Sequence, residues 1–221
     1  MKGILKHHKE VDRKLWIDFL MQSPQGAVYA HPAYLDVVAP GWQAIEVWQD
    51  QTLLAIMPLY IKSKGGMEYA LQPSFCQYWG IFFAPRGETG NYKHFSLRRK
   101  IVKAVLEVIP KGIRWFLFGF APEFDYPHPF HWEGYELKTR FTYRLDLSLG
   151  NAALEKAFGS DTRYDIRKAA GLGLLVKSSL DGSQLEKLIL ANHASGKHLL
   201  KPAELVVLGT LIPVLVEQHL G

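Results

Sequence analysis

Residues 138–148 read KTRFTYRLDLS. They begin the stretch Lys138–Ser178, which is the most informative part of this 221-residue chain. Apolar side chains recur there at every second position: Phe141, Tyr143, Leu145 and Leu147. A period of two gives a β-strand one apolar face and one polar face. The pattern therefore predicts a half-buried strand over residues 141–147.

A short helix-forming piece, NAALEKAFGS at residues 151–160, follows this strand and leads into a second helical pattern. Ser160 or Asp161 can cap the start of the second helix, where an acidic side chain also favours the positive end of the helix dipole. Gly171 is placed to end it. We expect a helix over about 161–170.

Basic side chains mark one face of this predicted helix. Arg163 and Arg167 are four residues apart, so they leave the helix on the same side, with Lys168 next to them and Arg140 near enough on the strand to join. Such a face can hold a phosphate or a carboxylate. The alternative is a solvated helix face in which Asp165 pairs with Lys168.

The order of strand, short helix and basic helix resembles the FemAB-type branch of the GNAT acyltransferase superfamily. Its members are aminoacyl and acyl transferases, many of which build the peptide cross-bridges of bacterial cell wall. The matching residues are Thr142, Leu145, Asp146, Leu147, Ser148, Arg163, Arg167, Lys168, Ala169, Gly173, Leu174 and Val176. An earlier segment also looks like the family, with Tyr29, Pro32 and Tyr34 at the start of its first domain.

The resemblance implies two tandem GNAT-like domains, the first over residues 1–140 and the second beginning in residues 141–221 and incomplete. It also implies transfer of an acyl or aminoacyl group onto an amine, with aminoacyl-tRNA or acyl-CoA as the donor. The acceptor would be a small molecule or a nucleotide-linked peptide such as a peptidoglycan precursor. The family's donor-side residues in the second domain's sheet have no counterpart here, so independent catalysis is an open question.

The rest of the chain predicts a mixed α/β fold, with a largely antiparallel sheet flanked by helices on both faces. Helical spacing or helix signals occur at 10–22, from Pro32, and at 92–109, 181–197 and 201–219; strand-like runs occur at 43–50, 52–63, 67–73, 77–85 and 113–120. In the helix at 92–109, the apolar positions predict an outward direction for Arg98 and its basic neighbours.

Composition describes a globular protein of one domain or two small ones, with 48% apolar residues and a net charge of +5. The single cysteine, Cys76, fits a reducing compartment, and the start MKGILKHHKE lacks the apolar core of a signal peptide. The longest apolar run, residues 205–216, is too short to span a bilayer. We therefore predict a cytoplasmic protein without a transmembrane segment.

The same run, LVVLGTLIPVLV, is apolar nearly all around and must be covered if it forms a helix. The first domain can cover it, or a second copy of the chain in a homodimer. A third alternative is that the chain is a fragment or a short version of a longer protein.

Two loops have part of the glycine pattern with which acyl-CoA enzymes wrap a pyrophosphate. RGETGN at residues 86–91 stands between a strand and a helix, but its spacing is off by one and a glycine is lacking. KAAGLG at residues 168–173 falls at a helix C-terminus, where carbonyls rather than N–H groups are free. Neither loop is a good CoA site. This favours the donor that the FemAB resemblance implies, aminoacyl-tRNA, or another donor that the sequence does not identify.

Gln77 and Tyr78 are the candidate acceptor residues, because they lie in an aromatic run, residues 75–83, where a buried hydroxyl or amide needs a partner. The alternative is that this run is core, with Cys76 a buried inert thiol. Two histidine pairs, His128 with His131 and His193 with His198, offer no third ligand, so no metal site is predicted.

No pattern selects a catalytic residue, although Glu123, Asp125 and Glu133 are candidates for a general base. Two other functions stay open beside the transferase. The chain can be a non-catalytic module that binds an anionic ligand, or an interaction domain that dimerises through its apolar C-terminal helix.

Overall fold

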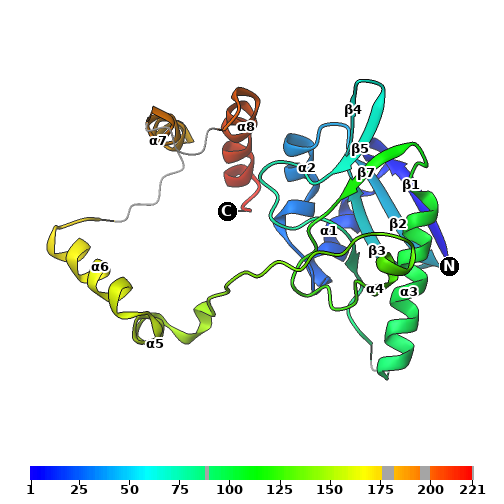
Figure 1. The fold of residues 1–221 in the computed structure, drawn as a ribbon, viewed down its shortest axis with the longest axis horizontal. Helices are drawn as coiled ribbons and strands as arrows, with labels where there is room; N and C mark the ends of the chain where they lie inside the picture. Colours follow the sequence, from blue (N-terminus) through cyan, green and yellow to red (C-terminus); the bar gives the residue numbers. More distant parts are fainter. Residues whose placement is uncertain (88–89, 176–181, 195–199, 221) are drawn as a thin grey trace. The chain divides into compact units, whose positions relative to one another are not determined.

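The structure is a computed structural model that describes residues 1–87, 90–175, 182–194 and 200–220 (Figure 1). The chain forms two compact units. The first unit comprises Met1–Leu137 together with Leu180–Gly221, and the second unit comprises Lys138–Ser179. Each unit is described by itself below.

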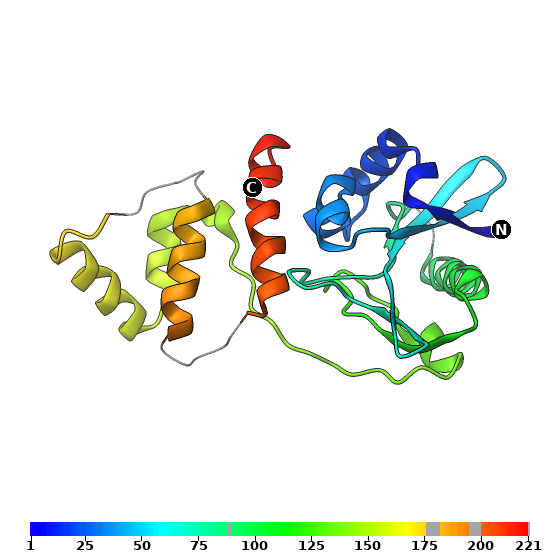
Figure 2. The same cartoon turned by 90° about the horizontal axis from the view of Figure 1, so that it is seen from above.

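The first unit contains both sheets and most of the helices. Its strands are β1 (Lys2–His7), β2 (Gln43–Gln49), β3 (Thr52–Leu59), β4 (Ile61–Lys64), β5 (Met67–Leu71), β6 (Phe82–Phe83) and β7 (Ile113–Leu117). Its helices are α1 (Arg13–Gln22), α2 (Pro32–Val38), α3 (Asn91–Val108), α4 (His128–Trp132), α7 (Gly182–Ala194) and α8 (Pro202–Glu217). The second unit contains the 3-10 turn η3 (Leu147–Leu149) and the helices α5 (Asn151–Ala157) and α6 (Ser160–Gly171), which Figure 2 shows from above.

Four antiparallel strands in the order β1-β2-β3-β6 form sheet A. Asp50 and Gln51 join β2 to β3 as a two-residue turn, and Asp50 has a positive φ of 54°. Strand β1 was not predicted; it lies against α3 so closely that a Cβ at Gly3 would stand 2.2 Å from the carbonyl oxygen of Ala104. Only glycine fits there.

Sheet B has the order β4-β5-β7, with β4 and β5 antiparallel and β5 and β7 parallel. Gly65 and Gly66 join β4 to β5 with positive φ at both positions, as the sequence predicts for a tight hairpin. Residues 113–120 are almost entirely apolar, which predicts an interior strand, but that prediction is wrong at two positions of β7: Trp115 is 63% exposed and Leu117 is 61% exposed. Strand β7 pairs with a single neighbour, so it lies at an edge of sheet B.

Sheet A has a core on each of its faces. Ala44 and Ile56 pack with Trp16, Leu35 and Trp42 from the α1–α2 side. The neighbouring strand residues pack with the apolar face of α3, in a cluster that contains Ile45, Val47, Ala55, Met57, Ile101, Val102 and Val105. In Figure 1, α1 and α2 lie on one side of the strands and α3 on the other. The mixed α/β fold, with an antiparallel sheet flanked by helices on both faces, is confirmed.

Helix α3 has the predicted length, but Arg98 does not point outward. Its side chain is buried, with a relative exposure of 6%, as is that of His94 one turn earlier. The two residues are four apart and continue the inward stripe of Ile101 and Val105, so helical periodicity carries them into the interior.

Helix α8 packs against α2 and is partly covered by the first unit, which was one of the predicted alternatives (Figure 1). Leu211 is buried in the core on the α1–α2 side, and Val207 and Leu215 pack against the same cluster. Ser74 also donates a hydrogen bond from its Oγ to Glu204 Oε1 at 2.9 Å. Other apolar side chains of α8 face away, and Val206 is 70% exposed.

The predicted strand over residues 141–147 is absent from the second unit. Residues 139–146 have no regular structure, and Phe141 and Tyr143 are almost fully exposed. An alternating pattern forms a strand only when another strand supplies the hydrogen bonds and a core covers the apolar face. The second unit contains no other strand among its described residues, and Leu154 is its one buried side chain there.

A helix that crosses a bilayer must be long and apolar, and this requirement applies to each helix of the described residues. Each of them is too short or too polar to cross a membrane.

The attachment of α8 can be tested by truncating Leu211. We expect Leu211→Ala to lower the free energy of unfolding of the first unit by about 2–5 kcal/mol, because it leaves a cavity in a packed core. Urea unfolding followed by tryptophan fluorescence measures the change. The control Val206→Ala removes an exposed side chain of the same helix and should cost less than about 0.5 kcal/mol. Equal losses in the two variants would contradict the packing of α8.

Candidate functional site

The predicted basic helix is present as α6, one residue longer at each end than expected. Arg163, Arg167 and Lys168 are all exposed on it, and Arg167 Nε donates to the carbonyl oxygen of Arg163 at 3.3 Å. No ion pair joins any of the three cations to a carboxylate of the described residues; Asp165 does not pair with Lys168. The face is a cluster of solvated cations that an anion can reach.

The end of α6 explains why KAAGLG does not serve as a phosphate loop. Gly173 has a positive φ of 69°, and the N–H groups of Gly173 and Leu174 donate back to the carbonyls of Ala170 and Ala169. This pattern is the Schellman motif, which closes the C-terminus of a helix. The amide groups of the glycines are therefore used inside the protein.

The remaining predicted residues lie outside α6. Arg140 is exposed in the irregular segment of the second unit, whereas Gln77 and Tyr78 belong to the first unit. Gln77 is exposed, and the half-buried ring of Tyr78 stands edge-on to Tyr29 at 6.2 Å. Arg163, Arg167 and Lys168 lie together on α6.

The loop that carries Tyr78 is fixed by hydrogen bonds to its backbone. The Gln72 side chain donates to the carbonyl of Cys76 and accepts from the N–H of Gly119 at 2.9 Å. Phe75 adopts a positive φ of 66°, which is strained for an aromatic residue, and its carbonyl accepts the Tyr34 hydroxyl at 2.5 Å. Burial raises the pKa of Tyr34, so its hydroxyl stays protonated and remains a donor.

A second cluster of ionisable groups lies in the first unit, and the sequence did not predict it. We call it the Arg98 cluster: His94 and Arg98 on α3, with Asp125 from the loop before α4. His94 Nε2 is 3.4 Å from Asp125 Oδ2 without forming a hydrogen bond, and Arg98 NH1 is likewise buried without a hydrogen-bond partner. The guanidinium carbon of Arg98 lies 3.5 Å from the centroid of the Phe83 ring.

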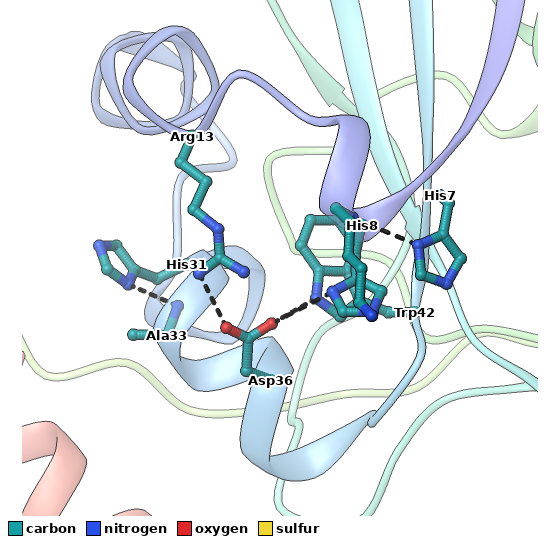
Figure 3. A network of polar contacts seen from close by, with 8 residues as sticks. His7, His8, Arg13, His31, Ala33, Asp36 and Trp42 are labelled. Atoms are coloured by element: carbon teal, nitrogen blue, oxygen red, sulfur yellow. Dashed lines mark hydrogen bonds and ion pairs between the residues drawn. The ribbon is translucent and has the colours of Figure 1, made fainter.

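A third polar cluster surrounds Asp36 on α2 (Figure 3). Asp36 Oδ2 accepts from Arg13 NH1 at 2.8 Å, and its Oδ1 accepts from Trp42 Nε1 at 3.0 Å. His8 Nδ1 lies 3.8 Å from the same Oδ1, and His31 Nδ1 accepts from the N–H of Ala33 at the start of α2. These contacts connect α1, α2 and the entrance of β2, so the cluster holds the fold together.

The histidines of this cluster favour the neutral form. Burial lowers the pKa of His31, with a further contribution from Arg13. Burial likewise lowers the pKa of His8, reinforced by His7 and opposed by Asp36. Across the described part of the chain, no three His, Cys, Asp or Glu side chains gather as metal ligands would.

The other candidate features contribute little geometry. In RGETGN, Arg86 NH2 donates to Asn91 Oδ1 at 2.6 Å, and residues 88–89 lie outside the described residues. His198 also lies outside them. A shallow surface hollow of about 550 Å³ lies beside α4, lined by His128, His131, Gly134, Tyr135, Glu136 and Leu137. None of the predicted substrate-binding residues lines it.

Burial raises the pKa of the Cys76 thiol to about 12. Because the thiolate is the reactive form, we expect native Cys76 to react with a disulfide reagent at about pH 8 at least tenfold more slowly than the unfolded chain does. The release of the coloured thiol followed with and without urea measures the two rates. Rapid reaction of the folded protein would show a reactive thiol and contradict the inert role.

The His31 imidazole makes stability depend on pH. Its pKa in the folded protein lies below the ordinary histidine value of about 6.5, so folding favours the neutral ring and the unfolded chain takes up the proton first. The stabilisation is present above about pH 6.5 and is lost as the pH falls through the folded-state pKa. Urea unfolding at about pH 8 and about pH 5 should therefore show a larger loss for wild type than for His31→Asn, which keeps a capping side chain that does not titrate. Identical losses would contradict this assignment.

Comparison with known proteins gives no relative for this chain: no family model, curated protein or solved structure matches it. The functional interpretation therefore rests on the side-chain geometry described above and on the motif resemblance of residues 142–176.

Proposed function

We propose that the chain is an N-acyltransferase or aminoacyltransferase of the FemAB type, with an amine of a peptidoglycan precursor as the acceptor. One observation carries the proposal: Arg163, Arg167 and Lys168 stand together on α6, exposed and without an ion-pair partner among the described residues. These cations belong to the motif on which the family resemblance rests. The mixed α/β fold is compatible with it, although a fold alone does not specify an activity.

In the proposed reaction, the amine nitrogen attacks the acyl carbonyl carbon. A carbon–nitrogen bond forms and the bond from that carbon to the donor's oxygen or sulfur breaks. The proton that the amine loses goes to this leaving oxygen or sulfur, which departs as an alcohol or a thiol. Alignment of the two substrates and stabilisation of the oxyanion supply most of the rate, and no covalent enzyme intermediate is needed. Aminoacyl-tRNA or acyl-CoA would supply the acyl group.

The three cations on α6 would bind an anionic group of the donor or the acceptor. Arginine binds phosphate and carboxylate through a planar fork of N–H donors, and Lys168 adds a point charge beside it. The pair Arg163 and Arg167 lies on one side of the helix, so both side chains can contact the same group. Since the cations are exposed, their contribution should weaken as salt concentration rises.

The test is a thermal-shift titration of the full chain with acetyl-CoA, CoA, a UDP-linked muropeptide and pyrophosphate, because a ligand specific to the folded state raises Tm. We expect the muropeptide to raise Tm and the double variant Arg163→Ala/Arg167→Ala to lose that rise. Without ligand the double variant should unfold within about 0.5 kcal/mol of wild type per substitution, since both side chains are exposed. The control Lys156→Ala removes an exposed cation of α5 and should keep the full response.

The ligands separate the alternatives. A shift with CoA or acetyl-CoA alone would identify an acyl-CoA enzyme, and a shift without turnover of any acyl donor would leave an anion-binding module. If no ligand raises Tm, or if the double variant responds as wild type does, the assignment of α6 as the binding face is wrong.

A further inference from the structure

Arg98 is a buried cation to which no acceptor of the described residues is hydrogen-bonded. Its relative exposure is 6%, its NH1 has no hydrogen-bond partner, and its guanidinium lies over the ring of Phe83. Stacking on an aromatic face satisfies the plane of a guanidinium but leaves its N–H edges free. The N–H groups at the edge of the Arg98 guanidinium therefore lack the acceptors that buried arginines normally have.

The same deficit occurs at His94, one helical turn before Arg98. Its Nε2 is also buried without a hydrogen-bond partner, although Asp125 Oδ2 is 3.4 Å away. Asp125 has a side-chain exposure of 49%, so water solvates much of its charge. Among the described residues, the carboxylate that stands near these two buried donor groups of α3 is that of Asp125, which is partly solvated.

The local charge favours an additional anion. Burial lowers the pKa of Arg98 to about 10, opposed by Asp125 and reinforced by Arg86, so Arg98 is still protonated at neutral pH. A buried charge without a partner destabilises a fold strongly, whereas a bidentate oxyanion satisfies the fork directly. Asp125 acts on the Arg98 charge without hydrogen-bonding to it, and His94 can donate a further hydrogen bond.

We propose that the Arg98 cluster binds an oxyanion, a phosphate or carboxylate group of a ligand, through Arg98 and His94. The inference does not rest on the transferase function, because it concerns a separate cluster of the first unit. Asp125 marks the side on which the cluster meets solvent, and its carboxylate competes with the anion for Arg98. The ring of Phe83, over which the Arg98 guanidinium lies, packs against the ring of Phe124 with centroids 5.4 Å apart.

The test compares the full-length wild type with Arg98→Met, in sodium phosphate, sodium acetate and sodium chloride at matched ionic strength. We expect phosphate or acetate, but not chloride, to raise the Tm of wild type with saturation, and Arg98→Met to show no saturable rise. In chloride, Arg98→Met should melt at or above the wild-type Tm, because it removes a buried donor without an acceptor. The anion that saturates distinguishes a phosphate ligand from a carboxylate ligand.

Lys100→Met is the matched control, since it removes an exposed positive charge from the same helix and should keep the wild-type response. Arg98→Lys keeps the charge without the fork and should weaken anion binding roughly tenfold or more. Asp125→Asn removes the competing carboxylate and should tighten binding. The proposal is overturned if wild type shows no saturable rise with either anion, if the rise survives in Arg98→Met, or if Asp125→Asn abolishes it.

Discussion

The first unit depends on one constraint: sheet A is apolar on both faces. Successive residues of β2 and β3 alternate between two clusters, as Ala55 and Ile56 show, so neither face can be left to water. Helices α1 and α2 cover one face and α3 covers the other, and this need for cover sets the layer order. The close approach of β1 to α3 at Gly3 and the contact of α8 with α2 follow from the same packing.

Sequence periodicity predicted the features that depend on nearby residues. Helices α1, α2, α3 and α6 and both hairpin turns follow from local spacing, caps and glycines, and all are present. Strand β1 was missed because its pairing with β2 joins residues about forty positions apart, as in Lys6 and Ala44. The inward direction of Arg98 was readable from its spacing to His94 and Ile101, but a charge was expected to stay in water.

In the second unit, a local pattern predicted a strand that is absent. The alternation from Phe141 to Leu147 is the strongest strand pattern of the chain, yet those residues form no strand and their side chains are exposed. Strand formation is a property of a pair, and a pattern cannot report whether a partner exists. Helix α6 forms in the same unit because its hydrogen bonds are internal. The predicted basic face exists for that reason, while Arg140, which needed the strand for its position, does not join it.

The α6 cations and the Arg98 cluster differ in how much their charges destabilise the folded chain. Arg163 and Arg167 are exposed, so their charges hardly change the free energy of unfolding. Exposed cations of this kind occur on many helices that bind no ligand. Arg98 is buried beside Phe83, where a charge without an acceptor opposes folding. An apolar residue of similar length would fill the same space at lower cost. The buried Arg98 is therefore stronger physical evidence for a bound anion than the exposed cations of α6 are. This holds even though the α6 cations belong to the family motif.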